Sequence, residues 1–231
     1  LVCDHASRRF PAHLGTLGVA EPDTFEHIAW DIGAAELTRG LATALDAPAV
    51  LCRWSRLVVD CNRRPADPSA FPEVSDRTVV PGNVSMTAED REWRIRAIHT
   101  PYHAAIDAAL DAMIGRGVTP AFVAVHSFTP LLGEIARPWH VGVLWDRDER
   151  LPRPVLSALR AVEGLHVGDN EPYSGRHPTD YTLHAHAAMR GLPCLGFEIR
   201  QDLLGTPAGI AYWTQTLSTA LVAALSGAGD R

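Results

Sequence analysis

The sequence predicts a single α/β domain whose central sheet is mostly parallel or mixed and carries helices on both faces. Short runs of β-branched and aromatic residues alternate with segments of helical spacing, which is typical of such sheets. The length of 231 residues and the 46% hydrophobic content suit one domain with its own core. No internal repeat or linker divides the chain, so residues 1–231 are expected to form one domain.

The first elements follow from apolar patterning. Leu1–Cys3 is an apolar strand at the very start of the chain, which suggests that the natural protein begins earlier. Apolar residues at near-helical spacing predict a long helix over residues 25–45, ended by Pro48. Two short strands are then expected at Ala49–Cys52 and Leu57–Asp60.

A long loop and a long helix occupy the middle of the chain. Residues 64–87 are rich in Pro, Ser, Asp and Gly and lack periodicity, so we expect a loop, and loops of this length are often functional. A helix over residues 88–115 is expected to follow. Thr87 is its predicted N-cap, because Asp90 lies three residues later.

The second half of the chain alternates strands and helices. Strands are predicted at Ala121–Val125, Val141–Leu144, Leu165–Val167 and Cys194–Ile199, and helices over residues 152–163, 179–190 and 208–226. This alternation favours a sheet whose strands run mostly parallel and are covered on both faces.

Charge and composition exclude several classes of function. The net charge of −6 opposes phosphate neutralisation, and no apolar run approaches the roughly 20 residues of a membrane span, so we expect neither a nucleic-acid nor a membrane partner. All 21 basic residues are arginine, which excludes a lysine Schiff base. The four cysteines are scattered without C-x-x-C spacing, which favours reduced thiols in a cytoplasmic protein.

Polar residues follow the carboxyl ends of four predicted strands. They form the segments Asp4-His5, Asp60-Cys61-Asn62-Arg63, His126-Ser127 and Glu198-Ile199-Arg200. The carboxyl ends of parallel strands meet at one edge of a sheet, so these segments are expected to build one site. Glu198 and Arg200 are two residues apart and are therefore expected to share a face of the sheet.

Two histidines and a carboxylate from different strand ends suit a catalytic zinc ion that keeps one position open for water. A further glutamate that is not a ligand suits a general base. Arginine binds carboxylates bidentately, which suits a substrate that carries a carboxylate. The adjacent Ser127 is not expected to be a nucleophile, because it points to the opposite face from His126 and no G-x-S-x-G elbow is present.

The sequence resembles the N-formylglutamate amidohydrolase family over nearly the whole chain. The segments that carry the resemblance are CDHASRRFP at 3–11, AWDIGA at 29–34, SRLVVDCNRRP at 55–65, VPGN at 80–83, PYH at 101–103, HSFTP at 126–130, RPWHVGVLW at 137–145, GDNEPYSG at 168–175 and EIRQDLL at 198–204. That family is similar to zinc carboxypeptidases and aspartoacylase. The resemblance therefore implies a zinc-exopeptidase-like fold and one zinc ion per chain.

The resemblance also implies roles for individual residues. His5 and His126 become metal ligands and Glu198 the general base. Arg56 polarises the scissile carbonyl, while Asn62 and Arg63 of the D-x-N-R segment hold the substrate carboxylate. For a second substrate carboxylate we expect Arg200 or an arginine of the 64–87 loop.

One position departs from the carboxypeptidase pattern H-x-x-E, because Arg8 stands where the carboxylate ligand is expected. Asp31, within the family-like AWDIGA segment, is the predicted replacement, and Glu171 is the alternative. Glu171 is otherwise expected in the substrate pocket, together with His186.

The predicted activity is hydrolysis of the amide of an N-acylated acidic amino acid, with N-formyl-L-glutamate and water giving formate and L-glutamate. This small-molecule reaction implies a place in histidine catabolism. The alternatives are a zinc carboxypeptidase, a deacylase of another N-acyl amino acid, and a non-catalytic carboxylate-binding relative. The sequence does not define the native metal or the oligomeric state.

Overall fold

The computed structural model describes residues 1–177 and 180–226. Its main sheet has six strands in the order β2-β1-β5-β10-β8-β9. Their bounds are β1 Val2–Cys3, β2 Val50–Leu51, β5 Phe122–Phe128, β8 Val141–Leu144, β9 Val167–Asp169 and β10 Cys194–Arg200. Neighbouring strands run parallel except β8, which is antiparallel to β10. The predicted α/β fold with a mostly parallel, mixed sheet is therefore confirmed.

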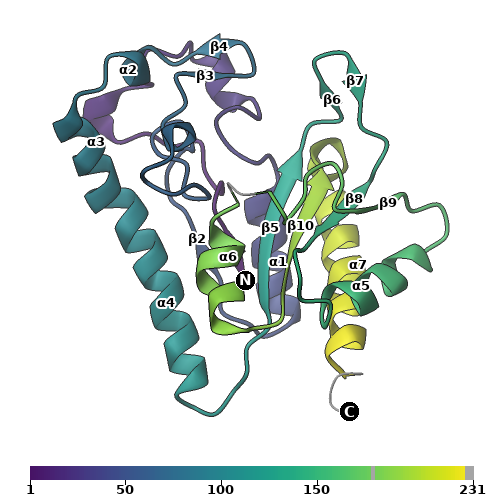
Figure 1. The fold of residues 1–231 in the computed structure, drawn as a ribbon. Helices are drawn as coiled ribbons and strands as arrows, with labels where there is room; N and C mark the ends of the chain where they lie inside the picture. Colours follow the sequence, from purple (N-terminus) through teal and green to yellow (C-terminus); the bar gives the residue numbers. More distant parts are fainter. Residues whose placement is uncertain (178–179, 227–231) are drawn as a thin grey trace.

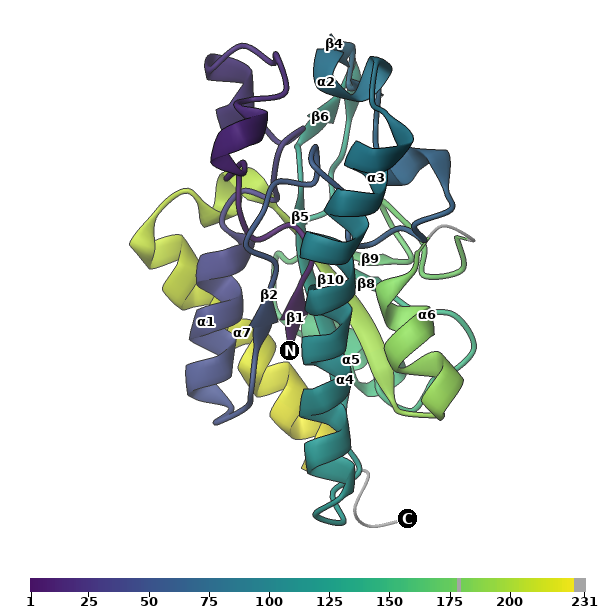
Figure 2. The ribbon, with the colours of Figure 1, turned by 90° about the vertical axis from the view of Figure 1, so that its left-hand side faces the viewer.

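Helices cover both faces of this sheet (Figure 1). On one face lie α1 (Ala34–Ala44), α5 (Pro152–Arg160) and α7 (Pro207–Ser226), whose apolar residues join one core cluster. On the other lie α4 (Thr100–Ile114) and the short α6 (Thr182–His186), which join a second cluster (Figure 2). None of the helices in the described ranges has the length and hydropathy that a membrane crossing requires.

Strand alternation divides the central strands between the two clusters. Val123 and Val125 of β5 and Phe197 of β10 pack toward α1, α5 and α7. His126 and Glu198 follow Val125 and Phe197 directly, so these two polar side chains point to the opposite face. The same alternation that buries the core thus delivers both polar side chains to one side of the sheet.

Two predicted elements were wrong. The helix expected over residues 25–45 starts only at Ala34, after Gly33 in a left-handed conformation (φ 79°). Residues 26–33 instead make tertiary hydrogen bonds: the Asp31 amide donates to His5 O, and the Ala29 carbonyl accepts from Arg56 N. These contacts, which no local pattern encodes, replace the first turns of the expected helix.

The segment Leu57–Asp60 is not a strand, although its apolar residues are buried. Val58 N donates to Ser55 O in a turn, and Asp60 N donates to the Ala70 carbonyl. The Arg94 guanidinium, buried below this segment, donates to the Val58 carbonyl at 3.1 Å. The segment is thus an irregular chain held by hydrogen bonds from outside the sheet.

The long helix expected over residues 88–115 is confirmed, and one π-helical turn interrupts its α-helical hydrogen bonding. It consists of α3 (Ala88–Arg94), a π-helical turn (Ile95–His99) and α4, and the backbone stays helical at both junctions. Thr87 caps its start, because its hydroxyl accepts from the Asp90 amide at 3.1 Å.

The expected loop over residues 64–87 contains short elements of its own. These are a 3₁₀ turn (Pro68–Ala70), the hairpin β3 (Val74–Ser75) and β4 (Thr78–Val79), and α2 (Pro81–Val84). The remaining short elements are the hairpin β6 (Leu131–Leu132) and β7 (Ile135–Ala136), and the 3₁₀ turns Ala12–Leu14, Pro22–Phe25, Ala188–Arg190 and Gln201–Leu204. The helix expected over 179–190 corresponds to α6 and the 3₁₀ turn that follows it; residue 179 lies outside the described residues.

Candidate active site

A cavity of about 540 Å³ opens at the carboxyl ends of β1, β5 and β10. It collects seven of the ten predicted site residues: His5, Asp31, Arg56, Asn62, Arg63, His126 and Glu198. The polar strand ends therefore do converge. Although residues 57–60 are irregular and not a strand, Asn62 and Arg63 after them still reach this cavity.

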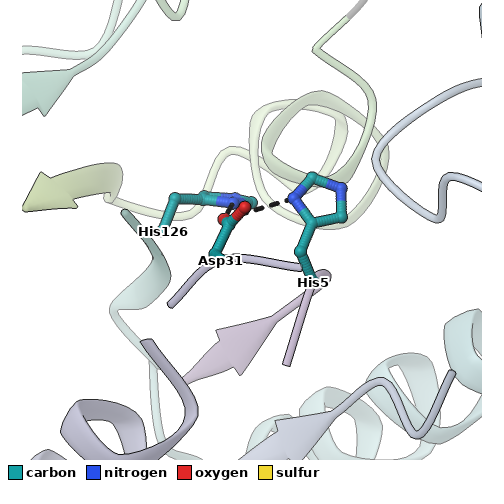
Figure 3. A group of neighbouring side chains, drawn as sticks. All are labelled: His5, Asp31 and His126. Carbon is teal, nitrogen blue, oxygen red and sulfur yellow. Dashed lines mark hydrogen bonds and ion pairs between the residues drawn. The ribbon is translucent and has the colours of Figure 1, made fainter. Parts of the chain in front are cut away.

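His5, Asp31 and His126 form the deepest group of this cavity. Asp31 Oδ2 lies 3.2 Å from His5 Nδ1 and 2.8 Å from His126 Nδ1, so the carboxylate stands between the two rings (Figure 3). One potential ligand atom from each residue lies within 4.8 Å of the others, and all three residues are buried. Two imidazole nitrogens and one carboxylate oxygen are the donor set of a catalytic zinc site.

A second carboxylate orients each of these histidines. Asp60 Oδ1 lies 2.8 Å from His5 Nε2, and Asp4 Oδ2 lies 3.2 Å from His126 Nε2. Asp4 is itself held by Tyr102 Oη and Thr182 Oγ1, which donate to its Oδ1. Carboxylates in this outer position fix ring orientation and tautomer in metal sites, leaving the inner nitrogen free to bind the metal.

The charges of this group fit a divalent cation. Burial opposes protonation of both rings, yet the surrounding carboxylates outweigh it and raise the pKa of His5 and of His126. The pKa of Asp31 is lowered although burial opposes this, because both histidines face it. Three buried carboxylates around two rings favour positive charge between them, and a divalent cation held by the two rings and Asp31 would supply it.

Glu198 lies beside this group on the neighbouring strand. It is the Cα partner of His126 in the β10–β5 register and is 7% exposed. Its Oε2 atom is buried and has no hydrogen-bond partner among residues 1–177 and 180–226. Burial raises the pKa of this carboxyl to about 7. A carboxyl with this environment is able to exchange a proton near neutral pH.

The guanidinium of Arg56 lies at one side of the His5–Asp31–His126 group. Its guanidinium donates to Asp60 Oδ2 at 2.7 Å and lies 3.6 Å from Asp31 Oδ1, while about a quarter of its side chain stays exposed to the cavity. It is therefore positioned by the same carboxylates that surround the histidines.

Asn62 and Arg63 line the cavity next to Arg56. Asn62 Oδ1 accepts from the backbone amides of Tyr181 and Thr182, at 3.0 and 2.9 Å, at the start of α6. Because its oxygen is engaged, the amide nitrogen of Asn62 is the group left to bind a ligand. Arg63 donates to the carbonyl of Asn62 at 2.8 Å.

Three predicted substrate residues do not line the cavity. Arg200, the last residue of β10, turns away and donates to Asp202 at 2.8 and 3.2 Å. Glu171 is exposed, although its neighbours Asn170 and Pro172 line the cavity. His186 is buried behind the site and bonds to His103 and Asp107. Arg200 still belongs to β10, but its guanidinium is taken up by Asp202 instead of reaching the cavity.

Two glycines allow residues 170–174 to form part of the cavity wall. A side chain at Gly142 of β8 or at Gly168 of β9 would collide with the carbonyl of Glu171. Glycine at both positions therefore lets residues 170–174 lie directly against the sheet edge, where Tyr173 joins the cavity lining.

Sequence reasoning assigned no role to three carboxylates of the site. Asp4 and Asp60 directly adjoin His5 and the Asn62-Arg63 pair, so their position beside predicted residues was an available signal. Asp180 lines the cavity, its buried Oδ1 has no hydrogen-bond partner among the described residues, and burial raises its pKa to about 6. No local pattern marks Asp180, which reaches the cavity through the fold.

Comparison with known proteins gives the family of the chain and structures that share its fold. The sequence model of the N-formylglutamate amidohydrolase family matches residues 1–205. The structure is similar to that of the gene product Atu2144 from Agrobacterium tumefaciens, with a TM-score of 0.94, 35% identity, and coverage of 98% of this chain and 89% of that one.

A second structure shares the fold at lower similarity. It is an N-formylglutamate amidohydrolase from Ralstonia eutropha JMP134, with a TM-score of 0.69, 19% identity, and coverage of 99% of this chain and 92% of that one. No curated protein sequence matches the chain significantly.

Proposed function

The chain belongs to the N-formylglutamate amidohydrolase family, and on this premise we propose that it hydrolyses the amide bond of an N-acyl amino acid with the help of one zinc ion. N-formyl-L-glutamate, which gives formate and L-glutamate, is the first candidate substrate. The observation that carries the proposal is the buried His5–Asp31–His126 group beside the unpartnered carboxyl of Glu198. The four cysteines, all free thiols, fit a cytoplasmic enzyme.

His5 Nδ1, His126 Nδ1 and an oxygen of Asp31 are the groups that would hold the metal. A zinc ion bound there supplies a Lewis acid and lowers the pKa of a coordinated water to about 7. Asp60 keeps the His5 ring oriented by accepting from its outer nitrogen, and Asp4 lies within ion-pair distance of the outer nitrogen of His126. Arg56 keeps Asp31 and Asp60 in place from the side of the cavity.

Glu198 performs the proton transfers. Its free Oε2 accepts a proton from the attacking water, and the same atom then returns that proton to the nitrogen of the leaving amine. A carboxyl with a pKa near 7 is suited to both steps, because neither protonation state is strongly disfavoured at neutral pH.

The cationic side of the cavity binds the substrate. The exposed part of Arg56 donates to the oxygen of the scissile carbonyl as negative charge develops on it. The Asn62 amide nitrogen and the Arg63 guanidinium hold the α-carboxylate. Both side chains line the same cavity, so one carboxylate can contact both groups.

A deacylase of another N-acyl amino acid is the second candidate, and the position of Arg200 favours it. The arginine expected to hold a second carboxylate pairs with Asp202 outside the cavity. A substrate with one carboxylate and an uncharged side chain satisfies the arginines that do line it. The cavity of about 540 Å³ also has room for an acyl group larger than formyl.

The decisive measurement combines metal content with formate release from N-formyl-L-glutamate before and after chelation. About one zinc per chain and turnover that chelation abolishes and zinc restores would support both parts of the proposal. Zinc without formate release, but with turnover of N-acetyl or longer N-acyl amino acids, would favour the second candidate. Protein that neither binds zinc nor turns over any of these amides would contradict the proposal and leave a carboxylate-binding relative.

A further inference from the structure

Three histidines lie behind the substrate-binding segment 61–63 without lining the cavity. His99 belongs to the π-helical turn, His103 to α4 and His186 to α6. Each is buried, with exposed fractions of 3%, 8% and 3%. Their rings lie close together, since the centroid of His103 is 4.3 Å from that of His99 and 5.0 Å from that of His186. The chemistry proposed for the cavity uses none of them.

Two of these rings hold the backbone on either side of Asn62. His103 Nε2 lies 2.9 Å from the carbonyl oxygen of Cys61, and His99 Nε2 lies 2.9 Å from the carbonyl oxygen of Arg63. A carbonyl oxygen only accepts, so both rings donate from Nε2. The direction in which Asn62 and Arg63 enter the cavity is therefore set by two imidazole donors on the long helix.

His186 connects this arrangement to the protein surface. Its Nε2 lies 2.7 Å from His103 Nδ1, and its Nδ1 lies 2.9 Å from Asp107 Oδ1. Asp107 is 45% exposed and also accepts from Arg190 at 2.6 Å. A line of hydrogen bonds thus runs from an exposed carboxylate through two buried rings to the Cys61 carbonyl.

The three hydrogen bonds along this line need one proton more than two neutral imidazoles carry. The Cys61 carbonyl and the Asp107 carboxylate both need an N–H pointing at them, and the contact between the two rings needs a third. Two neutral imidazoles carry only two N–H groups between them, whereas three are needed. All three hydrogen bonds form together only if the His103–His186 pair carries one positive charge.

The surroundings place that charge on His186. Burial lowers the pKa of His103 to about 4, with the neighbouring His99 acting in the same direction, so His103 is the neutral member. Burial likewise lowers the pKa of His99. The groups that face the pair are Asp107 and the guanidinium of Arg190 on the outer side, and His99, Tyr102, Tyr181 and the more distant Asp4 on the inner side.

We propose that His186 and His103 form a singly charged, proton-sharing pair, anchored by Asp107, that positions the 61–63 segment for binding of the substrate carboxylate. The inference rests on the proposed function, because it assigns a positioning role in the same site. When the pair loses its extra proton at alkaline pH, one of the three hydrogen bonds is lost. The two neutral rings then share two N–H groups among three contacts, so His103 donates to the Cys61 carbonyl in only some of their tautomers, and binding by Asn62 and Arg63 weakens.

The kinetic consequence is a change in KM rather than in kcat. Glu198 and His126 stand on β10 and β5, and neither belongs to this line of hydrogen bonds. Loss of one hydrogen bond that orients the segment corresponds to a rise of about fivefold in KM. KM for N-formyl-L-glutamate should therefore rise by about this factor at alkaline pH while the zinc-loaded enzyme keeps its kcat.

The variant that tests the inference is His186→Gln, because the glutamine amide nitrogen donates to His103 Nδ1 without titrating. We expect it to keep a low KM and to lose the alkaline rise, while His186→Phe has the high KM at every pH. His184→Gln, an exposed residue of the same helix, is the matched control and should follow the wild type. An alkaline rise in KM that is equal in wild type and His186→Gln would overturn the inference.

A second readout is independent of turnover. Histidine ¹⁵N NMR of the wild type, assigned with His103→Gln and His186→Gln, should show His186 with both ring nitrogens protonated near neutral pH and one nitrogen deprotonated at alkaline pH. Two neutral rings throughout this range would overturn the inference even if the enzyme hydrolyses its substrate. If the wild type releases no formate but the NMR shows the charged pair, the proposed substrate is wrong and the pair stands.

Discussion

Glu198 stands directly opposite His126 across the parallel β10–β5 pair, so the proposed base and a proposed metal ligand share one face of the sheet. Because Glu198 is not one of the proposed metal ligands, a mutation can remove the base and keep all three ligands. Glu198→Gln should lower kcat by about 10²–10⁴-fold, because proton transfer is lost, while the zinc content stays at the wild-type value. Kinetics and metal analysis on the same preparation test this, and retained activity would show that another group is the base.

The same substitution should stabilise the metal-free protein at alkaline pH. The folded state raises the pKa of Glu198 to about 7 from 4.5, so it binds this proton more tightly than the unfolded chain does. Folding stability therefore falls as pH rises between these two values, and above pH 7 the cost reaches up to about 3 kcal/mol. Urea unfolding of chelated Glu198→Gln should show its gain over wild type above pH 7 and little gain near pH 4. A pH-independent difference would contradict this.

Asn62 has two separable roles. Its oxygen caps the start of α6 by accepting from Tyr181 and Thr182, whereas its amide nitrogen is proposed to bind substrate. Asn62→Asp keeps an acceptor and should retain wild-type stability, but KM should rise because a carboxylate repels the substrate. Asn62→Ala should raise KM and also lose about 1 kcal/mol of stability. Wild-type KM in the aspartate variant would remove Asn62 from the substrate site.

Arg63 and Arg200 should differ in their effect on substrate binding. Arg63 lines the cavity, and its removal should raise KM by about 10- to 100-fold through loss of a charged hydrogen bond. Arg200 pairs with Asp202, so Arg200→Ala should change KM by less than about twofold. Steady-state kinetics of both variants check this. A large effect of Arg200→Ala would mean that substrate draws this side chain into the cavity.

Asp60 should tune metal affinity without being a ligand. It accepts from His5 Nε2 and from Arg56, so Asp60→Asn weakens the orientation of both. We expect zinc affinity to fall by about 10- to 100-fold in competition with a chromophoric chelator. Asp67→Asn, in the same loop but outside the cavity, is the control and should bind zinc like the wild type. Equal affinities in the two variants would be inconsistent with the outer-carboxylate arrangement.

The parts of the site that follow strands were predictable from sequence. His5, His126 and Glu198 each come at or near the end of a short apolar run, and parallel topology brings such ends together. Alternation within β10 also explains why Glu198 faces the cavity. Alternation did not predict that Arg200 stays outside the cavity, because the 3₁₀ turn after β10 places Asp202 within hydrogen-bonding distance of its guanidinium.

The parts that depend on contacts between distant segments were not predictable. The buried Leu57–Val59 run has a strand-like composition, but its backbone bonds to Arg94 and Ala70 instead of to a neighbouring strand. Residues 26–33 have helical spacing, yet tertiary hydrogen bonds to their backbone replace helix. His186 was expected at the substrate, whereas its partners His103 and Asp107 lie 83 and 79 residues away in the chain.

The π-helical turn at Ile95–His99 fixes the rotation of α3 relative to α4. Arg94 before this turn holds the 57–60 segment, and His99 and His103 within and after it hold the 61–63 segment. Each residue of an α-helix advances about 100° around the axis. Deleting one residue of this turn would therefore rotate one set of donors away from the segments that they hold, although Arg94, His99 and His103 would all still be present. For this helix the number of residues between Arg94 and His103 is therefore as much a part of the active site as their identity, and related sequences that keep both residues must also keep that spacing.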